Sequence, residues 1–401
     1  MKACHMGPSL TTNLWKLASI RAIRSFILII PVIVLFFQEN GLSVREIFLL
    51  QALFSAAVIV FEIPTGYLSD RFGRRTSIII GCCLGIIGHF VYVVGTGFWS
   101  FLIAEILLGL GASFLSGTES ALLYDSLIEL GRTNEHKRIE GRNASLGMVS
   151  ESIASILGGA LALISLRFPL YCEAVIMLCL IPLSISIVEP KRHTLTARRN
   201  PIRDMLQIMK YALHDHQEIK WLCLYSGVVG ASTLTMVWFI QPYLQQGGLP
   251  IAYFGIVWAA FQLAGATCSW HAHSIENWLG KRASLVLLMV LPVFGYFVLG
   301  STGSLAASVF IGLFYITRGI HGPIVADYLN GLVASEIRAT VLSVRNLLAR
   351  LLFAVLGPIM GWVHDQTSLS TALYLSGSLF LVLGGLVLVG LIRSEKHSPN
   401  K

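Results

Sequence analysis

The stretch Gly-Tyr-Leu-Ser-Asp-Arg-Phe-Gly-Arg-Arg, residues 66–75, lies between two apolar stretches that are each long enough to cross a bilayer. A basic loop that only fixes membrane orientation would explain Arg71, Arg74 and Arg75. It would not explain Asp70, nor the two glycines at fixed distances from it. The stretch therefore predicts a turn with a function of its own between two membrane helices.

The composition of the 401 residues excludes a soluble globular protein. Charged residues make up 12% and hydrophobic residues 55%, whereas soluble domains carry about 25% charged residues; the mean hydropathy is +0.73. The apolar stretches are rich in Leu, Ile, Gly and Ala without polar alternation, which favours helices over a β-barrel. We predict an all-α integral membrane protein with about twelve transmembrane helices, at roughly 17–38, 47–66, 76–97, 99–123, 143–165, 168–188, 220–244, 251–272, 283–300, 303–327, 338–362 and 370–392.

The net charge of +8 is distributed in a way that indicates membrane orientation rather than nucleic-acid binding. Basic residues cluster in alternate loops, and the intervening loops hold almost none apart from Arg45 and Arg167. This alternation predicts that both termini and the long middle loop are cytoplasmic. The middle loop divides the chain into an N-terminal six-helix bundle (1–188), a cytoplasmic central loop (189–219) and a C-terminal six-helix bundle (220–401).

The two halves carry traces of one repeat. The pattern Gly-x-Glu/His-x5-Asp-x-Leu occurs at 117–127 and again at 319–329. A degenerate version of the 66–75 stretch lies at 273–282, where Gly280, Lys281 and Arg282 match the final Gly-Arg-Arg. Equivalent positions in both halves predict two parallel repeats with a binding site at the membrane midplane between them.

The 66–75 stretch matches without a gap the G-x-x-x-D-R-x-G-R-R motif of the major facilitator superfamily, which lies between the second and third helices of that family. The resemblance extends from about Leu14 to Arg393 and is to a bacterial subgroup, which implies a multi-pass inner-membrane secondary transporter that works as a monomer. In the family this motif acts as a conformational switch, here the residues Gly66, Asp70, Arg71, Gly73, Arg74 and Arg75. Asp70 would face the positive end of the eleventh helix near Ile337, with Arg74 holding it, and so close the cytoplasmic side.

The chain departs from the family in two places. The fourth helix often carries an arginine where this chain has Glu105. The antiporter motif of the fifth helix has Gly-Pro where this chain has Ala154-Ser155. These departures weaken the case for a drug–proton antiporter without excluding it.

Ionisable residues inside membrane spans are costly, so their default interpretation is functional. Glu105, Glu119 and Glu151 are candidate proton carriers, and the expected helical geometry puts Glu105 and Glu119 near one face of the fourth span. Arginines suit a carboxylate or another planar anion. In the family, spans one, four, seven and ten line the cavity. The candidate cavity residues are Arg24, Glu105, Glu119, Glu151, Trp238, Gln241, Gln262, Arg318, His321 and Arg345. Two cytoplasmic ion pairs are also expected, Asp125 with Arg142 and Asp327 with Arg338.

These features together predict a proton-coupled transporter that exports a small anionic or zwitterionic molecule of the siderophore or metabolite kind. The alternatives are an uptake symporter or facilitator for an organic acid, multidrug efflux, and a non-transporting receptor on the same fold. The expected partners are a small molecule, protons and lipid, without nucleic acid. We expect no enzymatic activity, since H-E-x-x-H and G-x-S-x-G motifs are lacking, no metal-ligand spacing, and no cofactor besides the proton gradient.

Overall fold

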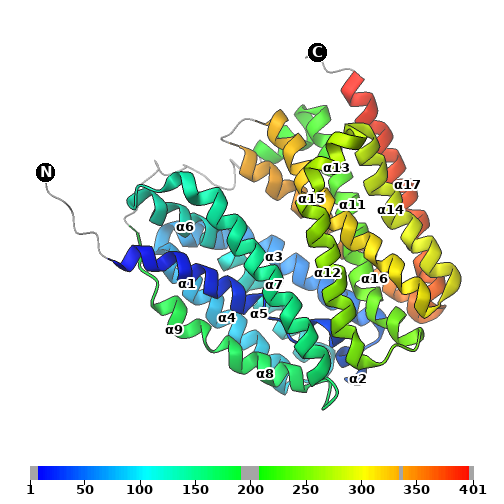
Figure 1. Cartoon of the computed structure of the whole chain (residues 1–401), viewed down its shortest axis with the longest axis horizontal. Helices are drawn as coiled ribbons and strands as arrows, with labels where there is room; N and C mark the ends of the chain where they lie inside the picture. The colour runs from blue at the N-terminus through cyan, green and yellow to red at the C-terminus, as the bar shows by residue number, and fades with distance from the viewer. Residues whose placement is uncertain (1–7, 191–206, 334–336, 397–401) are drawn as a thin grey trace, which may run out of the picture. The chain divides into compact units, whose positions relative to one another are not determined.

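The computed structural model describes residues 8–190, 207–333 and 337–396, and these residues form helices and turns without a β-strand (Figure 1). In this part of the chain, eleven helical stretches are long and apolar enough to cross a membrane. The prediction of an all-α membrane protein is therefore confirmed. The stretches are Val44–Ser69, Arg74–Val94, Gly97–Glu129, Thr133–Leu161, Phe168–Ile185, Gln217–Gln246, Ile251–Trp270, Lys281–Thr302, Leu305–Leu332, Thr340–Gln366 and Leu369–Ser394.

The chain divides into two compact units. Unit 1 comprises residues 1–33 and 57–201, and unit 2 comprises residues 34–56 and 202–401. This division differs from the predicted bundles at residues 34–56, which pack within unit 2. The helix α3 (Val44–Phe72) therefore begins in unit 2 and continues in unit 1. Most of the predicted central loop, residues 191–206, lies outside the described residues.

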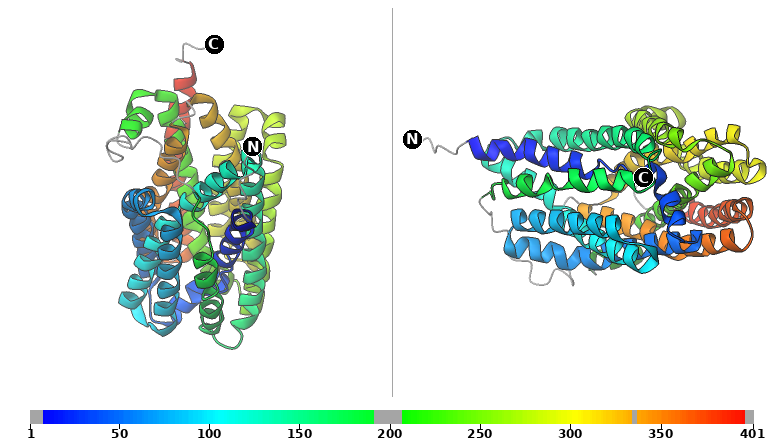
Figure 2. Two further views of the ribbon diagram at one scale, coloured as in Figure 1. Left: turned by 90° about the vertical axis from the view of Figure 1, so that its left-hand side faces the viewer. Right: turned by 90° about the horizontal axis from the view of Figure 1, so that it is seen from below.

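Unit 1 is organised around the pair α4 (Arg74–Val94) and α5 (Gly97–Leu115), which lie side by side (Figure 2). Glycines allow this approach, because a Cβ atom added at Gly111 would lie 2.9 Å from the backbone oxygen of Gly81. The other elements are α1 (Pro8–Arg24), η1 (Ile30–Val32), α6 (Thr118–Glu129), η2 (Thr133–Glu135), α7 (His136–Leu161), α8 (Phe168–Met177) and α9 (Leu180–Ile185).

Unit 2 is organised around α11 (Gln217–Gln246), whose side chains are mostly buried. This helix packs against α15 (Gly312–Leu332), α16 (Arg338–Gln366) and α17 (Leu369–Lys396). Tyr225 and Tyr296 are fully buried and donate to the carbonyls of Leu285 and Ser232. The remaining elements are α2 (Ile33–Glu39), η3 (Tyr211–Asp215), η4 (Ile251–Tyr253), α12 (Phe254–Trp270), α13 (Ala272–Leu279), α14 (Lys281–Thr302) and η5 (Leu305–Ile311).

Two predicted spans are interrupted. The first, expected as one helix at 17–38, consists of α1, which ends at Arg24, and of η1 and α2, which begin at Ile30 and Ile33. The fourth, expected at 99–123, is divided between α5 and α6 at Gly117. The φ angle of Gly117 is +72°, a conformation that glycine adopts readily and other residues do not. Both interruptions lie in unit 1, and they determine where its charged side chains meet.

Candidate functional site

A pocket of about 400 Å³ in unit 1 lies beside both interruptions. Arg24 is the last residue of α1 and Glu119 lies in the first turn of α6. Nη1 of Arg24 lies 2.5 Å from Oε1 of Glu119, and Nη1 of Arg21 lies 3.8 Å from Oε2 of the same carboxylate. The lining residues are Arg21, Arg24, Ser25, Ala112, Leu115, Ser116, Gly117, Glu119, Ser120 and Glu140.

The helix geometry suits this charge arrangement. The N-terminus of a helix carries partial positive charge, so Glu119 is favoured in the first turn of α6. The Glu119 side chain is only 12% exposed, so a charged partner within reach offsets the cost of removing its carboxylate from water. The pocket therefore presents two guanidinium groups and one shared carboxylate, an arrangement that can bind a small molecule carrying both charges.

Glu105 and Glu119 do not lie on one continuous helix, as the sequence had suggested, because the interruption at Gly117 separates them. Glu105 on α5 is 4% exposed and accepts a hydrogen bond from the Tyr92 hydroxyl at 2.7 Å. Glu151 is half-buried on α7. Neither Glu105 nor Glu151 is among the lining residues of the pocket.

Unit 2 holds the other predicted cavity residues. Ser226 Oγ on α11 lies 2.9 Å from Nε2 of His321, and Arg345 donates to the carbonyl of Gly322 at 3.3 Å. The Arg318 guanidinium lies over the ring of Tyr315, which Trp258 meets edge to face. Polar and aromatic side chains of α11, α12, α15 and α16 thus gather around the middle of α15.

The three remaining predicted residues are Trp238, Gln241 and Gln262, and their polar groups have different surroundings. Gln241 accepts a hydrogen bond from the Val34 backbone N–H at 2.7 Å, so its carbonyl oxygen has a structural partner. The Trp238 and Trp258 indole N–H groups are buried and have no hydrogen-bond partner among the described residues. Gln262 is half-buried on α12. The two indoles can donate to a bound molecule.

The 66–75 stretch is held by acidic groups of unit 1. Glu189 accepts hydrogen bonds from the backbone N–H groups of Arg74 and Arg75, at 2.9 and 2.6 Å, and so caps α4. The Arg71 guanidinium lies over the Phe72 ring. Gly73 has a φ of +109° immediately before α4, and Gly280 has a φ of +77° immediately before α14. Gly66 lies within α3, and the side chain of Asp70 lies outside the described residues.

Both predicted cytoplasmic ion pairs require correction. Asp125 pairs with Arg74 rather than with Arg142, because Arg74 also reaches the carbonyl of Ala121 on the same helix. Arg338 donates to the backbone carbonyls of Asn330 and Val333, at 3.1 and 3.5 Å. Among the described residues, it forms no ion pair with the exposed Asp327. Arg338, at the start of α16, therefore satisfies carbonyls at the C-terminal end of α15.

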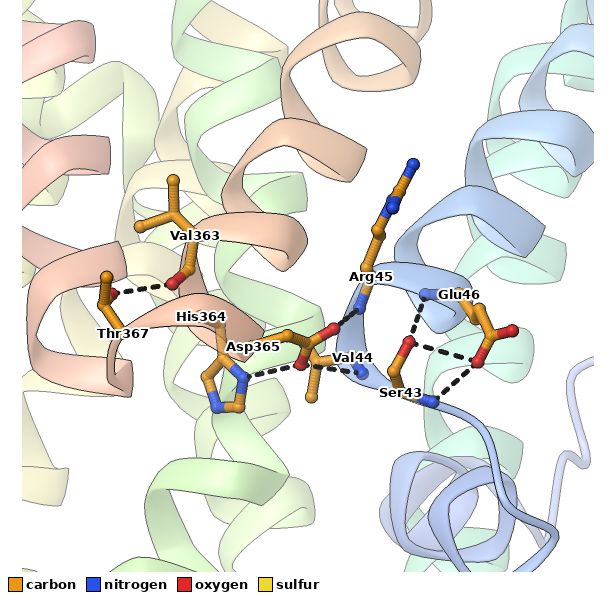
Figure 3. Close-up of polar contacts among 8 residues, drawn as sticks. All are labelled: Ser43, Val44, Arg45, Glu46, Val363, His364, Asp365 and Thr367. Atoms are coloured by element: carbon orange, nitrogen blue, oxygen red, sulfur yellow. Dashed lines mark hydrogen bonds and ion pairs between the residues drawn. The ribbon is translucent and has the colours of Figure 1, made fainter.

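Sequence reasoning missed Asp365 near the end of α16, whose carboxylate contacts the start of α3 in Figure 3. Its carboxylate accepts from the backbone N–H groups of Val44 and Arg45, at 3.2 and 2.8 Å. Ser43 and Glu46 complete this helix start as a capping box, with Glu46 accepting from the Ser43 backbone N–H at 2.9 Å. The Ser-x-x-Glu spacing was a readable signal of that helix start, whereas the role of Asp365 depends on packing.

Sequence reasoning also missed the buried acid Glu173 on α8, which is 0% exposed. Its carboxylate contacts His89 of α4 and the backbone N–H of Ile29. The available signal was an acid inside a membrane span. No group of three or more His, Cys, Asp or Glu in the described part of the chain is arranged to hold a metal ion.

Comparison with known proteins places these features in a family. The family model of the Major Facilitator Superfamily matches residues 18–358. The quinolone resistance protein NorA of Staphylococcus aureus (strain Mu50 / ATCC 700699) is 23% identical over 168 residues, which are 42% of each chain. An uncharacterized transporter of Buchnera aphidicola subsp. Schizaphis graminum is 35% identical over 115 residues, 29% of this chain and 26% of the relative. The matches thus span less than half of these relatives.

Solved structures show the same fold over nearly the whole chain. The nucleoside transporter NupG matches with a TM-score of 0.79 at 12% identity, covering 94% of this chain and 98% of NupG. A D-xylose–proton symporter matches with a TM-score of 0.69 at 14% identity, covering 97% of this chain and 98% of the symporter.

Proposed function

The chain belongs to the Major Facilitator Superfamily, and on that premise we propose that this membrane transporter exports a small zwitterionic or anionic molecule in exchange for protons. The proton gradient is the energy source and no cofactor takes part. We place the protein in a bacterial inner membrane as a monomer with cytoplasmic termini, because basic loops alternate along the chain and the relatives are bacterial. The relative named for quinolone resistance supports export over uptake.

The observation that carries the proposal is the Arg24–Glu119 pair in the pocket of unit 1. A zwitterion can offer its carboxylate to Arg24 and its ammonium group to Glu119. The guanidinium fork matches a planar carboxylate. Each charge of the bound molecule then replaces one member of the resident pair, so neither Arg24 nor Glu119 is left unpaired in a half-buried site.

Exchange follows from competition at Glu119. The carboxylate can hold either a substrate ammonium group or a proton, but not both. A proton arriving at Glu119 therefore displaces the substrate, which is the requirement for antiport. Binding of one and release of the other then shift the populations of the transporter's states.

A second candidate function, uptake of an organic acid together with a proton, is favoured by the same Arg24–Glu119 pair. It applies when the substrate is an organic anion without an ammonium group, because the direction of coupling is then reversed. The anion would take Arg24 and leave Glu119 with only the more distant Arg21, at 3.8 Å, so Glu119 would take up a proton to avoid a poorly compensated buried charge. Substrate and proton would then bind together, as in an uptake symporter for an organic acid. The direction of proton movement separates the two functions.

The test is proton movement in proteoliposomes that contain a pH-sensitive dye, with pools of zwitterionic and anionic metabolites added on one side. We expect zwitterions to drive protons in the opposite direction, and Glu119→Gln to abolish this movement while substrate binding persists. The matched control is Glu135→Gln, a half-buried carboxylate that pairs with Arg132 outside the pocket. Unchanged coupling in Glu119→Gln contradicts the site, and binding without flux in wild type indicates a non-transporting receptor.

A further inference from the structure

A second buried polar site lies in unit 1, apart from the pocket. Oε1 of Glu173 lies 2.8 Å from Nε2 of His89, an ion-pair distance, and it accepts no hydrogen bond among the described residues. The other carboxylate oxygen, Oε2, accepts from the backbone N–H of Ile29 at 3.1 Å. Nδ1 of His89 lies 2.7 Å from the carbonyl of Gly85.

These contacts fix the number of protons on the pair. A backbone carbonyl can only accept, so Nδ1 of His89 must carry hydrogen for its contact with Gly85 to be attractive. Nε2 and Oε1 lie 2.8 Å apart, and this contact is attractive only when one of the two atoms carries a proton. Either imidazolium and carboxylate, or neutral imidazole and carboxylic acid, satisfies this condition. Without that proton, two lone pairs would face each other in a buried site.

The pair is linked to the interruption of the first predicted span. Ile29 immediately precedes η1, which ends the segment between α1 and α2. Its backbone N–H has Glu173 as acceptor because the helix is broken there. Adding a second proton to the pair would place hydrogen on both nitrogens of His89 and on the carboxyl group, so the Ile29 N–H would donate to a neutral acid, which is a weaker acceptor than a carboxylate. Removing the single proton would break the contact with His89 instead.

We propose that His89 and Glu173 form a proton-binding site whose occupancy controls the backbone at residues 25–32. With one proton, all three contacts are attractive; with none, the contact with His89 is lost; with two, the contact with Ile29 is weakened. The interrupted segment thus responds to the protonation of an acid on α8. That this proton takes part in transport rests on the proposed function, whereas its binding does not.

Other charged groups face this region and are the competing sites of titration. Tyr92 on α4 donates to Glu105 on α5, and Glu105 lies close enough to act electrostatically on His89. Arg167, just before α8, donates to the carbonyls of Val93 and Gly95. The charged residues described on the other elements packed against α4 and α8 include Lys16, Arg21, Arg24, Glu119, Asp125, Glu129, Arg138, Glu140, Arg142 and Glu151.

The experiment is amide deuterium exchange of residues 25–32 in the full-length protein, measured by mass spectrometry across the pH range in which it stays folded. Rates are normalised to the intrinsic rate at each pH and to α14 as an internal reference. In wild type we expect the normalised exchange to change about tenfold through one titration, as for loss of one buried hydrogen bond to a charged group. In Glu173→Gln we expect no titration, because the amide oxygen accepts from Ile29 and the amide nitrogen donates to His89 without a titrating proton.

Glu105→Gln is the matched variant, because it neutralises the neighbouring acid and leaves both contacts of Glu173 in place. We expect it to keep the titration of wild type. A titration that persists in Glu173→Gln, or that disappears in Glu105→Gln, overturns the proposal. The exchange measurement needs no substrate, so a negative result would not contradict the proposed coupling at Glu119. In the same way, an absence of coupled proton flux would not contradict the proposed titration of the His89–Glu173 site.

Discussion

Arg24 has a planar guanidinium that holds Glu119 at 2.5 Å, whereas Arg21 reaches the same carboxylate only at 3.8 Å. The Arg21 side chain is also more exposed, at 40% against 29%. Attraction between charges weakens with distance and with exposure to water. The two arginines are therefore unequal, and Arg24 is the one whose geometry a bound carboxylate should use.

Replacing Arg24 by lysine keeps the charge and removes the two-pronged geometry. We expect Arg24→Lys to raise the substrate concentration for half-maximal proton exchange by about tenfold, which corresponds to about 1.4 kcal/mol. Arg21→Lys should change it by less than about threefold, as expected of a more exposed and distant pair. Concentration series in the proteoliposome assay measure both. Equal effects of the two substitutions would show that the fork of Arg24 is not what binds substrate.

At the residue scale, composition could point to charged side chains but not to their partners. Arg24 and Glu119 were predicted because charge inside an apolar span is costly. Asp125 was paired with the wrong arginine, because Arg74 and Arg142 are chemically equivalent in a sequence and only packing distinguishes them. His89 was not among the predicted site residues, because its partner Glu173 lies far away in sequence and only packing brings the two together.

At the element scale, the interruption at Gly117 positions the carboxylate of Glu119. The φ of +72° would be strained for any residue with a Cβ atom, although nothing lies within 4 Å of the place that such an atom would take. A substitution there therefore changes the backbone energy without a steric clash. Gly141 in α7 also has open space around it, but has no positive φ, so it serves as the control.

We expect Gly117→Ala to lower the free energy of unfolding by about 1–2 kcal/mol, the cost of a left-handed conformation with a Cβ atom, and to weaken coupled exchange by moving Glu119. Gly141→Ala should be neutral or stabilising by up to about 1 kcal/mol, because alanine favours a helix. Denaturation in detergent measures stability, and the proteoliposome assay measures exchange. If the two variants behaved alike, the break between α5 and α6 would not depend on the backbone of Gly117.

The apolar spans could be predicted at this scale because a bilayer sets their length. The breaks could not all be predicted in this way. Residues 26–30 are apolar, so hydropathy runs through the gap between α1 and α2 without a change. Pro31 was the available sign, because proline removes a backbone donor. The break between α5 and α6 had a clearer sequence signal, Ser116-Gly117, but these two residues were predicted to lie within one continuous helix.

At the scale of the whole molecule, the repeat could be traced in sequence, but the differences between the halves could not. Gly73 and Gly280 both precede a helix with a positive φ, as equivalent positions should. The equivalents of the fourth span differ, since α15 runs unbroken through His321 while α5 and α6 are separate. Of the two repeat copies, therefore, only the one in unit 1 places its third residue, Glu119, in the first turn of a helix. The family and the fold are confirmed, whereas substrate and coupling stay predictions.

Membrane orientation is a property of the whole chain, and the alternation of basic loops predicts it. Thr96 precedes α5 in a loop without basic residues, and Thr133 begins η2 among the basic residues that follow α6. Both threonines are exposed. A bacterial membrane resists outward movement of short loops rich in Lys and Arg, so Thr133 should lie in the cytoplasm and Thr96 outside.

Single cysteines at these two positions, in a variant whose seven native cysteines are replaced, test this orientation with a thiol reagent that does not cross membranes. We expect Thr96→Cys to be labelled in intact cells and Thr133→Cys to be labelled in inside-out vesicles. In each case the labelling should exceed that from the opposite side of the membrane by about tenfold. Because consecutive loops must lie on opposite sides of the bilayer, this result fixes cytoplasmic termini for twelve spans. The reverse labelling pattern would mean that the termini lie outside the cell, and it would reverse the direction of transport assigned here. Labelling of both cysteines from the same side would contradict a membrane-spanning helix between positions 96 and 133.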